Sequence, residues 1–398
     1  MSRNPPVEDW ARDFDHTDAA WVADPYPIWD ELRRSCPIAH SDRYGGVWFP
    51  TRHEDVAAVA YDTDNFTSRS VVVTPHRPPD LSPRGIAPPI SSDPPFHQGA
   101  RRILLPAFSP KAIAPLEPVT RAYCEELVAG LEDQELVDAA VEYAQHIPVR
   151  VIATMLGFPP EDGATFRGFV DHALEDVTAP LEQRILGMQS LFAYLQVQVE
   201  DHIARPRDDL TTHLLEAEMD GQRIDATHVA GTIALLLLAG IDTTWSAIGA
   251  SLWHLAGHPQ DRERLVSEPG LLPTAVEELL RAYAPVTMAR LVKHDMEWQG
   301  CPMKADDWVL LSFPAANRDP AAFEDADGFV IDRRINRHAA FGLGIHRCVG
   351  SHLARMELRV ALEVWLAAFP TFHLADPDAV VWAGGQVRGP RRLPVRIG

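Results

Sequence analysis

The stretch Phe341-Gly342-Leu343-Gly344-Ile345-His346-Arg347-Cys348-Val349-Gly350 lies near the C-terminal end of a 398-residue chain and decides how the rest is interpreted. Its two glycines at alternate positions allow a tight backbone that can lie close to a flat partner. Apolar residues at helical spacing follow from Ser351, so Cys348 stands just before a helix begins. The helix dipole and free N–H groups there favour a thiolate, which is a metal ligand or a nucleophile. For a lone cysteine, the alternative is a buried structural residue in a glycine-rich loop.

Taken as a whole, the pattern Phe-Gly-x-Gly-x-His-x-Cys-x-Gly resembles the haem-binding signature of the cytochrome P450 family, with every fixed position present. The resemblance implies a single domain with the cytochrome P450 fold, mainly α with a small β region. It also implies haem b, bound between a long helix and the cysteine loop, with Cys348 as the metal ligand. Phe341, Gly342, His346 and Gly350 would be further cofactor-binding residues, and His346 would anchor a haem propionate.

Composition limits the class of protein. Apolar residues make up 46% of the chain, which is ample for a core, and the length allows one large domain or two. The net charge of −20 argues against nucleic acid as a partner, because such binding needs clustered lysines and arginines. The four cysteines are far apart in sequence and have no C-x-x-C spacing, and their sparseness fits a reducing compartment. We therefore expect a soluble, cytoplasmic monomer.

Two features argue against a membrane protein. No apolar run begins at the N-terminus, so we expect neither a signal peptide nor a membrane anchor. The longest apolar run, Val229 to Ile241, is too short to span a bilayer and is followed directly by polar residues. This run therefore predicts a buried helix.

The chain divides into an N-terminal arm and one domain. Residues 1–23 are expected to form a loose polar arm, and residues 24–398 a single haem-thiolate monooxygenase domain. Residues 71–90 are crowded with proline, which excludes a regular helix or a central strand. Apolar residues within this segment favour an ordered binding loop over a disordered linker. Amphipathic helices are expected over 116–131, 139–157, 162–174 and 181–203.

The segment Asp93-Pro94-Pro95-Phe96-His97-Gln98-Gly99-Ala100-Arg101 predicts a helix start, with Asp93 as its N-cap. His97 and Arg101 then share one helical face, which on its own is most often a solvated surface. The segment resembles the Asp-Pro-Pro-x-His-x-x-x-Arg segment of the same family, with Phe96 where Glu is usual. The resemblance implies that His97 and Arg101 bind a haem propionate, a task suited to the guanidinium group.

A long buried helix is predicted from Ala226 to about Ala256, capped by Asp225. Its pattern breaks at Ala239-Gly240-Ile241-Asp242-Thr243-Thr244, where we expect the Thr243 hydroxyl to bond back to the Ala239 carbonyl. On its own, this bond often does no more than bend the helix locally. The same bend can also open a groove beside Gly240 in which dioxygen could bind. The string resembles the oxygen-activating motif of the family. By that resemblance Ala239 and Gly240 contact the cofactor, and Asp242 and Thr243 are catalytic residues that relay protons to dioxygen.

Charged pairs complete the list of candidate residues. Glu278 and Arg281 face the same way on a predicted helix, as solvated ion pairs often do. They match the Glu-x-x-Arg of the family, a buried structural pair that Arg333 would complete. Arg290 resembles a second propionate-binding arginine of the family.

The resemblance implies insertion of one oxygen atom from O2 into a small apolar organic substrate, by hydroxylation or dealkylation. No flavin, dinucleotide or iron–sulfur motif is present, so electrons would come from a separate ferredoxin and its NAD(P)H-dependent reductase. Three arginines expected near the cysteine loop are candidates for binding that ferredoxin, or are ordinary solvated side chains: Arg102, Arg337 and Arg347. The residues expected to line the substrate pocket are Leu235, Leu238, Ala239, Thr243, Val286 and Met288, with residues 71–90 as a lid.

Three alternative functions are considered. A peroxygenase on the same fold would use hydrogen peroxide and would not need the proton relay of Asp242 and Thr243. A non-catalytic haem-binding protein would not need that pair either. A zinc hydrolase could use His346, Cys348 and His352 as ligands, but it leaves the other motifs unexplained.

Overall fold

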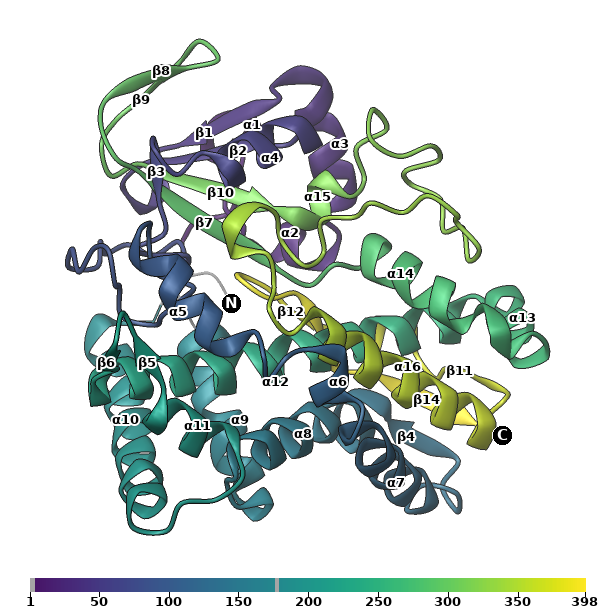
Figure 1. Cartoon of the computed structure of the whole chain (residues 1–398). Helices are drawn as coiled ribbons and strands as arrows, with labels where there is room; N and C mark the ends of the chain where they lie inside the picture. Colours follow the sequence, from purple (N-terminus) through teal and green to yellow (C-terminus); the bar gives the residue numbers. More distant parts are fainter. Residues whose placement is uncertain (1–3, 176–178) are drawn as a thin grey trace.

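Helices form most of the molecule, as the sequence predicts (Figure 1). The computed structural model describes residues 4–175 and 179–398. The helices are α1 (Trp10–Asp13), α2 (Ala19–Ala23), α3 (Tyr26–Ser35), α4 (His53–Tyr61), α5 (Phe96–Leu104), α6 (Pro110–Ile113), α7 (Leu116–Ala129), α8 (His146–Leu156), α9 (Gly163–Val170), α10 (Leu181–Ala204), α11 (Leu210–Glu216), α12 (Ala226–Gly257), α13 (Pro259–Ser267), α14 (Leu272–Ala282), α15 (Phe313–Ala316) and α16 (Ser351–Ala368).

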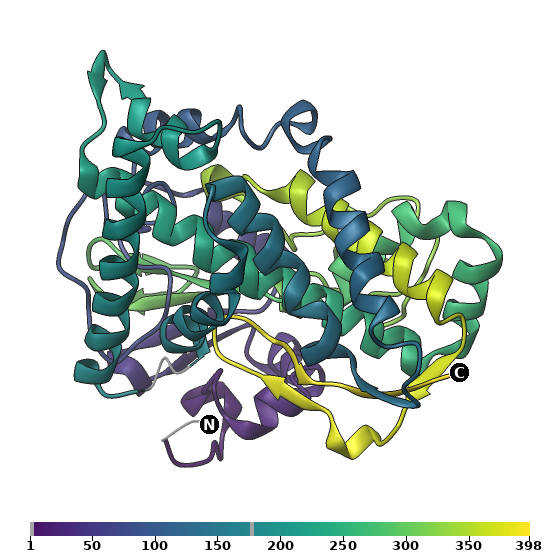
Figure 2. The same cartoon turned by 90° about the horizontal axis from the view of Figure 1, so that it is seen from below.

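The β structure is smaller and lies at two edges of the helical body (Figures 1 and 2). One sheet has the strand order β1-β2-β10-β7-β3, a second has the order β11-β14-β4, and three hairpins are separate. The strands are β1 (Ile38–Ser41), β2 (Val47–Pro50), β3 (Phe66–Thr67), β4 (Leu136–Asp138), β5 (Glu218–Met219), β6 (Gln222–Arg223), β7 (Thr287–Val292), β8 (Met296–Trp298), β9 (Cys301–Met303), β10 (Trp308–Ser312), β11 (Phe372–Leu374), β12 (Val381–Ala383), β13 (Gly389–Arg392) and β14 (Pro394–Ile397).

Helix α12 crosses the centre of the molecule (Figures 1 and 2). The Asp225 side chain caps it by accepting a hydrogen bond of 2.7 Å from the His228 backbone N–H, as the sequence predicts. By length and composition alone α12 could cross a membrane, but 72% of its most apolar window is buried inside the fold. Helices α8, α10 and α16 pack around it, so its apolar residues form the core.

The predicted loose arm at the N-terminus is wrong for the described residues 4–23. Phe14 and Trp21 are buried, and they pack against Phe49 of β2. Asp15 is also buried, where it accepts hydrogen bonds from the Thr17 hydroxyl and the Tyr44 hydroxyl. The polar composition was misleading because its aromatic residues and a satisfied buried carboxylate anchor the segment to the sheet.

Residues 71–90 contain neither helix nor strand, as predicted, and the segment is fixed to α12. The Thr232 hydroxyl donates to the Pro88 carbonyl over 3.0 Å, and Arg84 pairs with Asp225 over 2.9 Å. The predicted N-cap role of Asp93 is wrong. Its carboxylate instead accepts from the Thr67 hydroxyl and, over 2.9 Å, from the Ser68 N–H, and α5 begins without a side-chain cap.

Candidate active site

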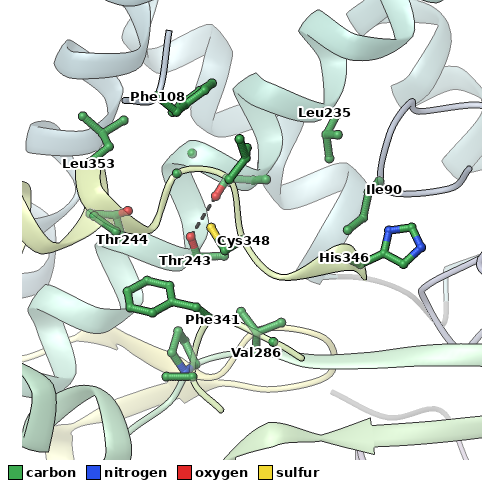
Figure 3. A pocket seen from close by; sticks show the side chains of 18 of the residues that line it. Ile90, Phe108, Leu235, Thr243, Thr244, Val286, Phe341, His346, Cys348 and Leu353 are labelled. Atoms are coloured by element: carbon green, nitrogen blue, oxygen red, sulfur yellow. Dashed lines mark hydrogen bonds between the residues drawn. The ribbon is translucent and has the colours of Figure 1, made fainter. Parts of the chain in front are cut away.

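A large cavity lies between α12 and the loop that precedes α16 (Figure 3). It encloses about 1360 Å³ of empty space, which includes space open to solvent. The cavity brings together residues from the segment before α5, from α12, from β7 and from the cysteine loop.

The cysteine loop has the tight backbone that its glycines predict. Gly342 and Gly344 adopt φ values of +72° and +68°, which side chains disfavour. A Cβ at Gly344 would collide with the Ala60 carbonyl of α4, so only glycine fits there. The Cys348 N–H donates to the Phe341 carbonyl over 2.7 Å and closes the loop. Its sulfur is thereby presented to the cavity (Figure 3).

Two effects act on the Cys348 thiol. Burial within the protein body raises its pKa, while the Gly350 N–H and the guanidinium groups of Arg101 and Arg347 act in the opposite direction. The helix N-terminus therefore does not by itself produce the thiolate that the sequence suggests. A bound metal cation reverses this balance, because a coordinating thiol is deprotonated.

A cluster of nitrogen-bearing side chains stands beside the cysteine: His97, Arg101, Arg290 and His346. The rings of His97 and His346 are 4.5 Å apart, and Nε2 of His346 lies 2.8 Å from the Ser68 hydroxyl. Burial, followed by repulsion from Arg101, lowers the pKa of His97 to about 4. Burial, followed by repulsion from Arg290, lowers the pKa of His346 to about 2, and burial also lowers the pKa of Arg290 to about 10. The cluster is thus short of negative charge.

These residues fit a haem. Neither ring nitrogen of buried His97 has a hydrogen-bond partner among the described residues, which is costly unless a ligand supplies one. Two propionates would supply the missing acceptors and the missing negative charge, and guanidinium groups bind carboxylates strongly. The glycine-lined loop allows a flat ring to approach the sulfur closely. His97, Arg101, Arg290, His346 and Cys348 are therefore the residues that would hold a haem here.

Helix α12 forms the opposite wall of the cavity with a narrow stripe of residues. The Thr243 hydroxyl donates to the Ala239 carbonyl over 2.8 Å, as predicted (Figure 3). Gly240 also lines the cavity, and a Cβ there would lie 3.3 Å from Ile152. Since its proton is engaged with Ala239, the Thr243 oxygen can accept a hydrogen bond from the cavity side.

Asp242 does not face the cavity, although its predicted role in proton transfer would place it there. It is fully buried, and among the described residues it is not part of the cavity wall. Its carboxylate accepts a hydrogen bond from Arg391 of β13, with which it forms an ion pair. Sequence reasoning missed Arg391, because nothing in a strand of the C-terminal hairpin indicates contact with the middle of α12.

Four of the predicted substrate-pocket residues line the cavity together with Thr243: Leu235, Ala239, Val286 and Met288. Leu238 does not line it among the described residues, and that prediction is wrong. Leu238 lies about 100° around the helix from Ala239, so its side chain packs against the core instead. Pro89 and Ile90, at the end of the proline-rich segment, also contribute to the wall.

Glu357 is a cavity residue that the sequence did not reveal. It lies one turn beyond Leu353 on α16, and both side chains face the cavity. It is buried, and its Oε2 atom has no partner among the described residues. Burial raises the pKa of Glu357 well above its usual range, which favours the protonated carboxyl group. The helical spacing from Cys348 was its only sequence signal.

The predicted ion-pair network is buried and complete. Arg281 donates two bonds of 2.8 Å to the two oxygens of Glu278, and both side chains are fully buried. Arg333 adds a bond of 2.9 Å to the same carboxylate, and the Val330 N–H adds one of 2.8 Å. Burial raises the pKa of Glu278, but these bonds outweigh it and lower the pKa overall.

A zinc site of His346, Cys348 and His352 finds no support. Within residues 4–175 and 179–398, no group of three His, Cys, Asp or Glu side chains could hold a metal ion together. His352 is exposed, whereas His346 is directed toward Ser68 and His97.

Comparison with known proteins agrees with this geometry. The family model for cytochrome P450 matches residues 161–378. The erythromycin C-12 hydroxylase of Saccharopolyspora erythraea is 37% identical, over 92% of this chain and 93% of the relative. The mycinamicin IV hydroxylase/epoxidase of Micromonospora griseorubida is 33% identical, over 92% of this chain and 94% of the relative. The solved structure of the polyketide synthase cytochrome P450 PksS of Bacillus subtilis has a TM-score of 0.88 and 28% identity, and the match covers 97% of this chain and 100% of that chain.

Proposed function

The chain belongs to the cytochrome P450 family, whose members bind haem b, and from this premise we propose that it inserts one oxygen atom from O2 into a small apolar organic substrate. The single observation that carries the proposal is the shared cavity. It brings the Cys348 sulfur, the side chains of Arg101, Arg290 and His346, and the Thr243 hydroxyl to one mostly apolar space. A thiolate, anion-binding groups and a proton carrier are the parts that such a reaction needs.

In this proposal Cys348 ligates the haem iron, and His97, Arg101, Arg290 and His346 hold the propionates. Phe341, Gly342 and Gly350 shape the loop against the ring, while Ala239 and Gly240 shape the opposite wall. The bound haem supplies the activation of O2, and a thiolate ligand favours cleavage of the O–O bond. His97 and Arg290 are buried, and Arg101 and His346 are half-buried, so these groups would orient the cofactor with limited competition from water.

Thr243 and Asp242 would supply protons. The Thr243 hydroxyl donates to the Ala239 carbonyl, so its oxygen would be free to accept a hydrogen bond from a proton donor on the cavity side, where dioxygen would be reduced. Asp242 directly precedes Thr243 and is a buried acid, and it would resupply the proton at Thr243 through water. General acid–base steps of this kind typically contribute about 10² to 10⁴ in rate.

The substrate would bind against the aliphatic residues of α12 and β7. Leu235, Val286 and Met288 offer contact area without hydrogen-bonding groups, which favours an apolar molecule. The named relatives hydroxylate erythromycin at C-12 and hydroxylate or epoxidise mycinamicin IV, so oxygen insertion into organic carbon is shared. A panel of small aromatics and terpenes, scored by the change in haem spin state, identifies the substrate class.

Electrons would come from a separate ferredoxin and its NAD(P)H-dependent reductase. Arg102, Arg337 and Arg347 are exposed, and they would pair with acidic groups of that ferredoxin despite the net charge of −20.

Isotope labelling tests the proposed reaction against the peroxygenase alternative. The purified holoenzyme is supplied with a surrogate ferredoxin, its reductase, NADPH and ¹⁸O2, and the product is analysed by mass spectrometry. We expect one ¹⁸O atom in the product when catalase is present. Incorporation of ¹⁸O only from added H2¹⁸O2 would show that the protein is a peroxygenase and not a monooxygenase.

A further inference from the structure

We propose that Arg391 is a latch that holds Asp242 away from the cavity, and that the β12–β13 hairpin releases this latch when the cavity is filled. The inference rests on the proposed function, because it concerns how Asp242 is made available as a proton source. It assigns a positioning role to Arg391, which does not touch the cavity wall among the described residues.

Three contacts fix the Arg391 guanidinium on one stripe of α12. It pairs with the Asp242 carboxylate, donates over 3.0 Å to the Ser246 hydroxyl, and lies 4.2 Å from the centre of the Trp245 ring. An arginine that is both bonded at its fork and stacked on an aromatic ring has one orientation. A lysine could not reproduce this arrangement, so the position is specific for arginine.

The strand that carries Arg391 lies unusually close to the helix. A Cβ at Gly389 would collide with Ser246, and the proline that follows, Pro390, packs beside Gly249. Glycine on each side of this contact allows the hairpin backbone to rest directly on α12. A small movement of the hairpin therefore moves Arg391 relative to Asp242.

The other end of the same hairpin contacts the cavity wall. Gln386 donates from Nε2 to the Met288 sulfur over 3.3 Å, and Val387 forms a β-bridge with Val286. The Thr287 N–H also donates to the Gln386 carbonyl over 2.8 Å. Val286 and Met288 both line the cavity, so an occupant that pushes on them pushes on the hairpin tip five residues or fewer before Arg391.

Gln386 can transmit a displacement of Met288 to the hairpin. Its Oε1 atom is buried and has no partner among the described residues, so its amide is held only on one side. When Gln386 moves with Met288, no hydrogen bond to Oε1 has to break among the described residues. A displacement of the hairpin tip would then move β13, which carries Arg391. The ion pair between Arg391 and Asp242 depends on precise geometry, so this movement would break it. Filling the cavity would thus open the latch and make Asp242 available only when substrate is present.

Variants of the latch test the proposal by activity. NADPH consumption is measured for holoenzyme with a surrogate ferredoxin and reductase, without added substrate. We expect Arg391→Met to raise this substrate-free rate at least severalfold, and Arg392→Met, its exposed neighbour on β13, to leave the rate unchanged. Ser246→Ala is the second variant, in case Arg391→Met does not fold. It removes one hydrogen bond of the latch and keeps the ion pair, so it should raise the substrate-free rate by a smaller factor. Unchanged rates in both latch variants overturn the proposal.

Hydrogen exchange supplies a test that does not depend on turnover. The probe is 4-phenylimidazole, an apolar molecule that binds haem iron and fills the space above it. We expect its binding to increase amide exchange in peptides covering residues 386–392 of the wild-type holoenzyme, and not in Gln386→Ala. Equal exchange with and without the probe in wild type contradicts the coupling. Asp242→Asn separates the two proposals. If this variant does not slow NADPH consumption, the proton role of Asp242 in the proposed function is wrong. If it slows NADPH consumption but the latch tests are negative, only the latch is wrong.

Discussion

At the scale of single residues, Thr243 carries the most specific role. Its hydroxyl is already bonded to Ala239, so replacing it costs one local bond and leaves the cysteine and the cationic cluster intact. Alanine is a better helix former than threonine, so α12 should remain folded. We predict that Thr243→Ala consumes NADPH at a near-normal rate, forms much less product and releases hydrogen peroxide.

The measurement for Thr243→Ala is product formed per NADPH oxidised, with peroxide assayed in parallel. Thr244→Ala, at the adjacent position of the same cavity wall, is the matched control. Tight coupling retained in Thr243→Ala would show that another group holds the proton at the cavity wall.

Glu357 gives a prediction about stability and pH. Its pKa is raised by burial in the folded protein, so the folded state favours the protonated form, and stability falls as pH rises above the unfolded pKa. Glu357→Gln keeps the neutral shape and removes this dependence. We expect the variant to gain stability relative to wild type as pH rises from about 4.5, the usual pKa of glutamate, toward neutrality. Thermal unfolding of both holoenzymes across that range measures it, and a margin independent of pH would mean that Glu357 is ionised when folded.

At the scale of elements, the Glu278 network ties α14 to the segment that carries Arg333. Both Glu278 and Arg281 are fully buried, so removing the carboxylate leaves two guanidinium groups without it. Breaking a buried pair in this way typically costs about 3–5 kcal/mol. We predict that Glu278→Ala yields little folded, haem-loaded protein.

An exposed pair on a neighbouring helix is the control for Glu278. Glu268 pairs with Arg264 over 3.4 Å, with 57% and 39% of the two side chains exposed. Such pairs typically contribute about 0–1 kcal/mol, so Glu268→Ala should fold and load haem normally. Soluble yield and the ratio of haem to protein are the readouts. Normal haem content in Glu278→Ala would show that folding does not depend on the network.

The elements also show what the sequence could and could not predict. Local signals were sufficient for α12, because its apolar run, its Asp225 cap and the Thr243 back-bond are all read within a few residues. Long-range contacts were not, since Arg391 meets Asp242 across 149 positions of sequence. Asp93 failed as a cap for the same reason, because its carboxylate bonds to Thr67 and Ser68, which the local pattern does not include.

At the scale of the whole molecule, the net charge of −20 and the exposed arginines make opposite contributions to binding of an acidic ferredoxin. We predict that the double variant Arg102→Glu, Arg337→Glu raises the KM for ferredoxin and flattens its dependence on salt. The haem spectrum should not change, because neither residue lines the cavity within the described part of the chain. Arg392→Glu, an exposed change on β13, is the control, and equal effects of the two changes would place the ferredoxin elsewhere.

The N-terminal residues show how the whole molecule can override composition. A polar segment was expected to be loose, but Phe14 and Trp21 have an aromatic surface to pack on once the sheet is assembled. Motif residues from four separate regions of the chain, in contrast, converge on one cavity: Arg101, Thr243, Arg290 and Cys348. Their convergence follows from the family fold, and the sequence indicated it only through the resemblance. Leu238 shows the remaining difficulty, because a pocket residue without a motif depends on the rotation of its helix.

The central claim is that Cys348 binds the haem iron as a thiolate. Reduction of the holoenzyme under carbon monoxide tests it directly, because a thiolate-ligated haem absorbs at a position unlike that of other ligands. We predict this absorbance for wild type and for single alanine variants of Cys36, Cys124 and Cys301, and its loss together with activity in Cys348→Ala. Persistence of the thiolate absorbance in Cys348→Ala would contradict the account.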